Sequence, residues 1–228
     1  MLNEVGTAGR ENLDVAHVDR YDDKEDAGAD AEVERLARLG LGPSSTVVDI
    51  GAGTGQFVLA VAPKCASVVA VDVSGVMLDR LATKLDAVGA RNVEVVEGGF
   101  LTYEHAGPPV DFVYSRWALH HLPDFWKALA LTRMRSMLRP GGVLRLLDIV
   151  YNFDPGEIAE RVEAWRSTLL VEAGPGELVQ ADVDDHVRDE HSTFAWLMEP
   201  MIKRSSFRIE EAVYSPDGFY AEYVARAI

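Results

Sequence analysis

The stretch at residues 46–57 constrains the fold most strongly, and it reads Thr-Val-Val-Asp-Ile-Gly-Ala-Gly-Thr-Gly-Gln-Phe. Its β-branched start is too short for a helix and apolar on both faces, which predicts a buried strand. Glycines then alternate through a turn at Gly51, Gly53 and Gly55, and residues 57–62 resume as a helix. Glycine permits a sharp reversal and close approach of a ligand to the backbone, and a helix amino terminus offers unpaired N–H groups. The stretch therefore predicts a nucleotide-type ligand site.

The spacing of these glycines separates two kinds of nucleotide site. Dinucleotide-binding proteins use G-x-G-x-x-G/A, whose last small residue lets helix and strand pack closely. Here Gln56 stands at that position, an additional glycine comes one residue earlier, and Asp49 precedes the first glycine by two residues. This D-x-G-x-G-x-G pattern resembles the first motif of the class I (Rossmann-like) S-adenosylmethionine-dependent methyltransferases of the small-molecule type.

A second acidic residue closes the next predicted strand, residues 66–71. Asp72 lies 17 positions beyond Gly55, near the roughly 20-residue offset of the carboxylate that reaches a ribose diol in nucleotide-binding folds. A carboxylate suits this task because it accepts two hydrogen bonds from neighbouring hydroxyls. We therefore expect Asp72 to hold the ribose of the ligand.

The third predicted strand, residues 93–96, leads into Gly99 and Phe100. In the family that the chain resembles, an acidic residue often stands at the position of Gly99 and meets the adenine amine. Without it, we expect Phe100 to pack on the adenine and backbone groups to read the edge of the base.

The fourth predicted strand, residues 109–114, is followed by Ser-Arg-Trp-Ala-Leu-His-His-Leu-Pro-Asp. This run and the Leu-Arg-Pro-Gly-Gly turn at 138–142 resemble the corresponding parts of small-molecule methyltransferases. The Asn/Asp-Pro-Pro-aromatic motif of base-directed amino-methyltransferases is not there. An imidazole titrates near pH ~6.5 and can take a proton at neutral pH, so His120 and His121 are candidate general bases. The alternative is that one or both pack structurally.

The order of predicted elements indicates an open, mostly parallel sheet with helices on both faces. The resemblance implies a three-layer, seven-stranded Rossmann-like sheet that ends in an antiparallel hairpin, and residues 207–214 and 219–227 flank a turn that predicts this hairpin. We expect a methyltransferase domain at 31–228 with a helical, lid-like insertion at 152–204. Residues 1–30 form an N-terminal arm, a possible lid, in which Tyr21 could cap the cofactor.

The resemblance implies S-adenosyl-L-methionine as methyl donor and S-adenosyl-L-homocysteine as product. It assigns the cofactor to the following residues: Asp49, Gly51, Ala52, Gly53, Gly55, Asp72, Val73, Gly99, Phe100, Ser115 and Arg116. Four residues are candidates for the substrate pocket: Tyr21, Trp117, Asp148 and Trp165.

Composition limits the partners that the chain can have. Its formal net charge is −15, and a strongly acidic surface is repelled by nucleic acid and by anionic membranes. The single cysteine, Cys65, allows no internal disulfide and no cysteine-cluster metal site, which favours a reduced, cytoplasmic setting. No apolar run approaches the roughly 20 residues that cross a bilayer, and the first residues do not resemble a signal peptide. We expect no metal, a small-molecule substrate, and a monomer or homodimer.

Two other functions compete with a methyltransferase that moves a methyl group to oxygen, nitrogen or carbon by in-line displacement. A nicotinamide-dependent oxidoreductase is disfavoured by Gln56 and by the lack of a Tyr-x-x-x-Lys pair. A non-catalytic S-adenosylmethionine-binding module would keep the glycine turn, and the sequence does not separate it from an enzyme.

Overall fold

The computed structural model describes residues 3–8, 28–172 and 180–228. Tyr21 lies outside these residues, as does most of the arm at 1–30. The elements follow in this order: η1 (Val5–Thr7), α2 (Ala29–Arg38), β1 (Thr46–Ile50), α3 (Gln56–Val61), η3 (Ala62–Lys64), β2 (Ser67–Asp72), α4 (Gly75–Val88), β3 (Val93–Glu97), β4 (Val110–Arg116), η4 (Leu119–His121), α5 (Asp124–Met137), β5 (Leu138–Tyr151), η5 (Pro155–Glu157), α6 (Ile158–Glu172), α7 (Gln180–Asp189), β6 (Thr193–Phe194), α8 (Ala195–Arg204), β7 (Phe207–Tyr214) and β8 (Tyr220–Ala227).

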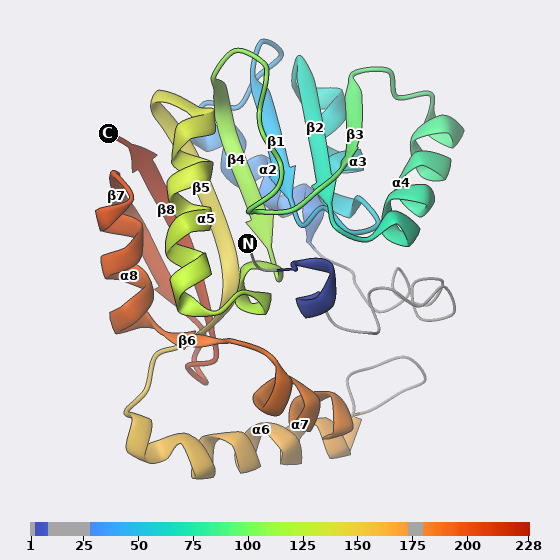
Figure 1. Cartoon of the computed structure of the whole chain (residues 1–228). Helices are drawn as coiled ribbons and strands as arrows, with labels where there is room; N and C mark the ends of the chain where they lie inside the picture. The colour runs from blue at the N-terminus through green and yellow to red at the C-terminus, as the bar shows by residue number, and fades with distance from the viewer. Residues whose placement is uncertain (1–2, 9–27, 173–179) are drawn as a thin grey trace.

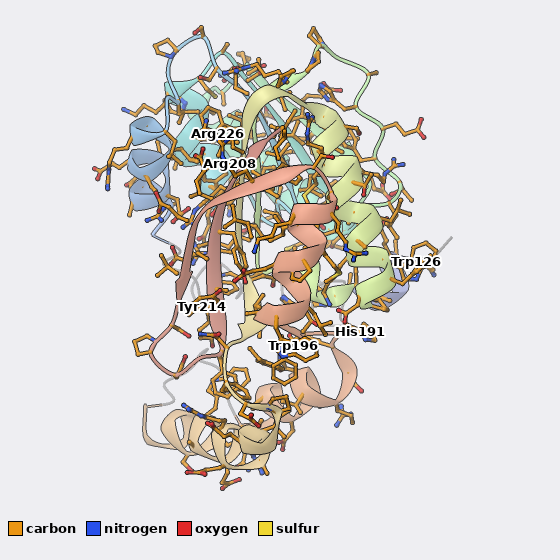
Figure 2. All side chains as sticks on the ribbon, turned by 90° about the vertical axis from the view of Figure 1, so that its left-hand side faces the viewer. Trp126, His191, Trp196, Arg208, Tyr214 and Arg226 are labelled. Carbon is orange, nitrogen blue, oxygen red and sulfur yellow. The ribbon has the colours of Figure 1, made fainter. Side chains whose placement is uncertain are left out.

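One sheet in the order β3-β2-β1-β4-β5-β8-β7 forms the centre of the molecule, and the short β6 pairs with the end of β5. Strands β1 to β5 run parallel, whereas β8 is antiparallel to both β5 and β7. The predicted Rossmann-like sheet with a terminal antiparallel hairpin is therefore confirmed. Figure 2 shows this hairpin edge-on, with Tyr214 near its turn and the paired Arg208 and Arg226 at its other end.

Two apolar layers cover the faces of the sheet. Helices α2, α3 and α4 pack on one face through side chains such as Leu36, Val58 and Leu81. Helices α5 and α8 pack on the other through side chains such as Leu131 and Met198. The central strands are apolar on both faces because both faces are covered, as expected for parallel strands.

Helices α6 and α7 lie beyond the carboxyl-terminal ends of the parallel strands, apart from the two layers (Figure 1). The last part of the predicted helical insertion at 152–204 begins with the short strand β6, and α8 then continues through Pro200. The carboxyl ends of β1, β2 and β4 face η1 and the helices α6 and α7. Open α/β sheets bind their ligands at this end of the strands. In the part of the chain that the structure describes, no helix has the length and apolarity required to cross a membrane.

Candidate cofactor and substrate site

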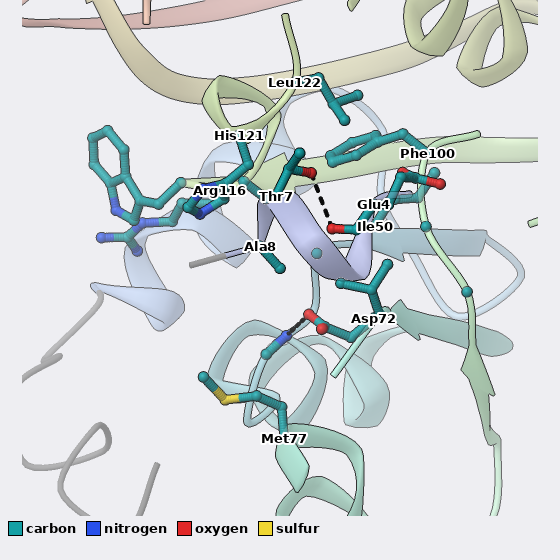
Figure 3. Close-up of a pocket in the computed structure, with 17 residues that line it drawn as sticks. Glu4, Thr7, Ala8, Ile50, Asp72, Met77, Phe100, Arg116, His121 and Leu122 are labelled. Atoms are coloured by element: carbon teal, nitrogen blue, oxygen red, sulfur yellow. Dashed lines mark hydrogen bonds between the residues drawn. The ribbon is translucent and has the colours of Figure 1, made fainter. Parts of the chain in front are cut away.

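A cavity opens at the carboxyl ends of β1, β2, β3 and β4 (Figure 3). Seven of the predicted cofactor residues line it: Gly51, Gly53, Asp72, Val73, Gly99, Phe100 and Arg116. Two further predicted residues, Trp117 and His121, line it as well. The structure thus brings most of the sequence-predicted site into one cavity.

The glycine turn between β1 and α3 has backbone angles and packing that require glycine. Gly51 and Gly55 adopt φ values of +79° and +83°, in the left-handed region that side chains disfavour. A Cβ at Gly51 would overlap the side chain of Ala118, and one at Gly55 would overlap Leu81. A Cβ at Gly53 would meet nothing within 4 Å, so the middle of the turn faces open space in the cavity.

Asp72 joins this turn to the end of β2. Its Oδ2 accepts a hydrogen bond from the backbone N–H of Gly53 at 2.8 Å, and its Oδ1 accepts one from Ser74 at 2.8 Å. Burial raises the pKa of Asp72, while the hydrogen bonds from Ser74 and Gly53 act against the rise. Each carboxylate oxygen keeps a lone pair for a further donor, which is what a ribose diol needs.

Four predicted cofactor residues support the cavity from behind. Asp49 is buried at the end of β1; its burial, and next the charge of Asp72, raise the pKa of Asp49 well above its ordinary range. Ala52 donates its backbone N–H to Val71, and Gly55 precedes α3 as its N-cap. Ser115 is fully buried within β4.

Glu4 is a cavity residue that sequence reasoning missed. It precedes η1 and is 6% exposed, and its Oε2 accepts a hydrogen bond from the backbone N–H of Leu101 at 3.0 Å. Its Oε1 lies 2.5 Å from the place that a Cβ of Gly99 would take. Burial raises the pKa of Glu4 above the usual value of a glutamate. The contact joins residues 97 positions apart, so no local sequence pattern predicts it.

The two predicted catalytic histidines have different surroundings. His121 lines the cavity, where burial, and then the charge of His120, lower its pKa to about 3. His120 is turned to a second cluster: its Nδ1 lies 2.5 Å from Asp148 Oδ1 and its Nε2 lies 3.2 Å from Glu190 Oε2. Burial lowers the pKa of His120, but the charge and hydrogen bond of Asp148, followed by those of Glu190, raise it to about 9.

The predicted substrate residues fall into two groups. Trp117, at φ +50° directly after β4, meets Tyr220 edge-on at 5.2 Å between ring centroids, and Tyr220 lies 6.3 Å from Trp165 of α6. Tyr220 therefore links the two tryptophans in an aromatic wall. Asp148 is fully buried beneath His120. Tyr21 cannot be placed, because it lies outside the described residues.

The sheet order and the glycine-lined cavity define a Rossmann-like nucleoside-binding protein. Residues 47–142 match the family described as a methyltransferase domain. An uncharacterized methyltransferase of Geobacillus thermodenitrificans is 30% identical over 121 residues, which are 53% of this chain and 54% of that protein. The tRNA 5-carboxymethoxyuridine methyltransferase of Escherichia coli is 28% identical over 162 residues, 70% of this chain and 60% of its own.

A solved S-adenosylmethionine-dependent methyltransferase from Aquifex aeolicus shares the fold, with a TM-score of 0.65, 16% identity and coverage of 94% of this chain and 99% of its own. The chain spans about half the length of the first two curated relatives, at 47% and 54%. Residues 47–142 therefore match a methyltransferase domain, and the whole chain has the fold of the class I S-adenosylmethionine-dependent methyltransferases.

The cofactor of this family is S-adenosyl-L-methionine, and the residues present suit it. The turn leaves room above Gly53, and Asp72 has acceptors free for hydroxyl groups. Asp49 and Asp72 also place two carboxyl groups, whose oxygens can accept hydrogen bonds, near a ligand that carries an ammonium group and ribose hydroxyls.

Proposed function

We propose that the chain transfers the methyl group of S-adenosyl-L-methionine to a small-molecule acceptor. The observation that carries this proposal is the Asp72 carboxylate, which grips the glycine turn at Gly53 and lines the same cavity as His121 and Trp117. A nucleoside gripped at Asp72 would extend its reactive end towards the aromatic wall.

Each part of the cofactor has a matching group in the cavity. The methionine portion would pass over Gly51 and Gly53, with Asp49 reaching its ammonium group through water or neighbouring backbone. The ribose would bind Asp72. The adenine would lie against Phe100 and Val73. The Glu4 carboxylate would take the place of the acidic residue that methyltransferases of this family often have at the position of Gly99. Gly99 leaves room for that carboxylate because it has no side chain.

The bound cofactor supplies a methyl group on a sulfonium, which is a good leaving group. The protein's task is then to align the acceptor with that methyl, and positioning alone can contribute about 7–11 kcal/mol. Trp117, Tyr220 and Trp165 would hold the acceptor and exclude water. Where the acceptor must lose a proton, His121 is the imidazole that lines the cavity and would accept it; it is neutral at pH 7, but a pKa lowered to about 3 makes it a weak base. His120, bonded to Asp148, would hold its neighbour in place.

A small acceptor fits the charge of the chain better than a nucleic acid does. The net charge of −15 opposes the phosphate contacts that dominate affinity for RNA. The relative that acts on tRNA nevertheless makes tRNA the second candidate acceptor.

Labelled cofactor separates these acceptors. The chain is incubated with [methyl-¹⁴C]S-adenosylmethionine and either a small-molecule extract or total tRNA, and label is followed by size fractionation. Unreacted cofactor is itself a labelled small molecule and is removed by chromatography; we expect label in a different small molecule and loss of that label in the Asp72→Ala variant. Label confined to tRNA would overturn the small acceptor, and bound cofactor without any transfer would identify a non-catalytic binding module.

A further inference from the structure

Three side chains from distant parts of the sequence converge beside the cofactor cavity. His120 belongs to η4, whereas His186 lies in α7 and Glu190 directly follows that helix. One potential ligand atom of each lies within 4.8 Å of the other two. His120 and His186 are buried, and the side chain of Glu190 is 19% exposed. Within the described residues this is the group with the spacing of a metal site.

One carboxylate oxygen, Oε2 of Glu190, lies close to a ring nitrogen of each histidine. Glu190 Oε2 lies 3.2 Å from His120 Nε2 and contacts Nδ1 of His186. Ligands bound to one ion at about 2.0–2.2 Å lie some 3 Å apart from one another, so the separation of Glu190 and His120 matches a shared ion.

The far nitrogen of each imidazole has its own oxygen partner. His120 Nδ1 lies 2.5 Å from Asp148 Oδ1, and His186 Nε2 lies 2.9 Å from Ser192 Oγ. A carboxylate only accepts, so Nδ1 of His120 is the donor in the first pair. Metal-bound histidines almost always donate their other N–H to such an oxygen, which fixes the tautomer and turns the second nitrogen's lone pair to the ion.

The chemistry of the ligands selects the ion. Two imidazoles and one carboxylate suit zinc and the other divalent first-row transition metals. Magnesium and calcium prefer sites built from oxygen alone. Three protein ligands also leave at least one coordination position open, as in metal sites that take up a further ligand.

We propose that His120, His186 and Glu190 bind one divalent first-row transition-metal ion. The ion would tie α7 to η4, next to His121, which lines the cavity. A backbone hydrogen bond already joins these parts, from His191 N–H to the carbonyl of His120 at 2.9 Å. The site stands apart from the cofactor contacts at Asp72.

Zinc titration tests the site directly. The full chain is freed of metal with EDTA and dialysed, and Zn²⁺ is titrated in by calorimetry with thermal melting in parallel. We expect one Zn²⁺ per chain and a higher melting temperature with metal, because an ion bound only to the folded state stabilises it. Co²⁺ should give visible absorption bands from a low-symmetry nitrogen and oxygen site.

Variants assign the ligands. Glu190→Gln and His186→Ala should each weaken Zn²⁺ binding at least tenfold, and Asp148→Asn should weaken it by about 10–100-fold, as partners behind a ligand do. His191→Gln is the matched control, because this neighbouring histidine is exposed. If circular dichroism shows that His186→Ala does not fold, the test of the site rests on Glu190→Gln, which preserves the shape of the side chain and removes its charge.

Two results would overturn the proposal. One is the lack of saturable binding at one ion per chain, which would make the cluster a hydrogen-bonded network around the Glu190 charge. The other is equal zinc affinity in the wild type and in Glu190→Gln. Metal is titrated without S-adenosylmethionine, so either result leaves the proposed methyl transfer untouched.

Discussion

Asp72 Oδ2 accepts a 2.8 Å hydrogen bond from the backbone N–H of Gly53, so one carboxylate fixes the glycine turn and lines the cavity at the same time. Asp72→Ala removes both functions. We expect it to weaken S-adenosylhomocysteine binding by about 1.5–3 kcal/mol, the range for hydrogen bonds to a charged group. Asp72→Asn keeps one acceptor and should fall between the wild type and Asp72→Ala in calorimetry. Equal affinity in all three proteins would remove Asp72 from the ribose site.

Gly55 and Leu81 are in such close contact that one determines what the other can be. A Cβ at Gly55 would overlap Leu81 Cδ1, and φ of +83° adds strain, about 1–2 kcal/mol for a residue with a side chain. Gly55→Ala should therefore lower stability in chemical denaturation by more than this strain alone. Adding Leu81→Ala to Gly55→Ala should remove the overlap. A double variant that loses the full sum of both single losses would show that the two positions do not interact.

The carboxylate of Glu4 lies in the space that a side chain at Gly99 would fill. If the Glu4 carboxylate meets the adenine, Glu4→Ala should weaken S-adenosylhomocysteine binding by about tenfold, or 1.4 kcal/mol. Gly99→Asp in that background should restore part of the affinity, since its carboxylate would fall near where Glu4 stood once Val73, whose Cγ1 lies 2.7 Å from the new Cβ, turns aside. Gly99→Asp alone should not help, because Glu4 Oε1 lies 2.5 Å from the new Cβ.

The exposed Glu104 provides the control for this pair, since Glu104→Ala makes the same change of charge away from the cavity. Unchanged affinity in Glu4→Ala, or no recovery in the double variant, would contradict the adenine assignment.

The buried Arg145 predicts that stability depends strongly on its guanidinium and only weakly on its exposed partner Glu222. Its guanidinium is fully buried and bonds both oxygens of Glu32 at 2.8 and 2.7 Å, while Glu222 at 2.8 Å is 40% exposed. Arg145→Ala should cost about 3–5 kcal/mol of unfolding free energy, because it leaves buried charge unpaired. Glu222→Gln should cost under about 1 kcal/mol, since water screens an exposed partner. Urea denaturation of both variants checks the order, and the reverse order would contradict it.

The sequence predicts the parts of this protein that rest on local patterns. The glycine turn at 51–55, Asp72 at a strand end and the terminal hairpin each have a signal within a few residues, and the fold prediction was confirmed. The parts that depend on distant contacts were missed. Glu4 meets Leu101 across 97 positions, and His120 meets Glu190 across the fold.

One of the missed contacts did have a weak local signal. His186 and Glu190 stand four residues apart in the sequence, a spacing that places two side chains on one face if the segment is helical, as it is in α7. Their meeting with His120 could not be read from that spacing, because it depends on how α7 packs at the end of the sheet. The orientation of the two adjacent histidines is likewise set by packing: His121 faces the cavity and His120 faces Glu190.

Calorimetric titration of the purified chain with S-adenosylmethionine, beside an identical titration with NADH, tests the cofactor site most directly. We predict saturable binding of S-adenosylmethionine in the micromolar range, about −8 kcal/mol, and no heat of binding with NADH. Saturable binding of NADH, or none of S-adenosylmethionine at millimolar concentration, would contradict the account.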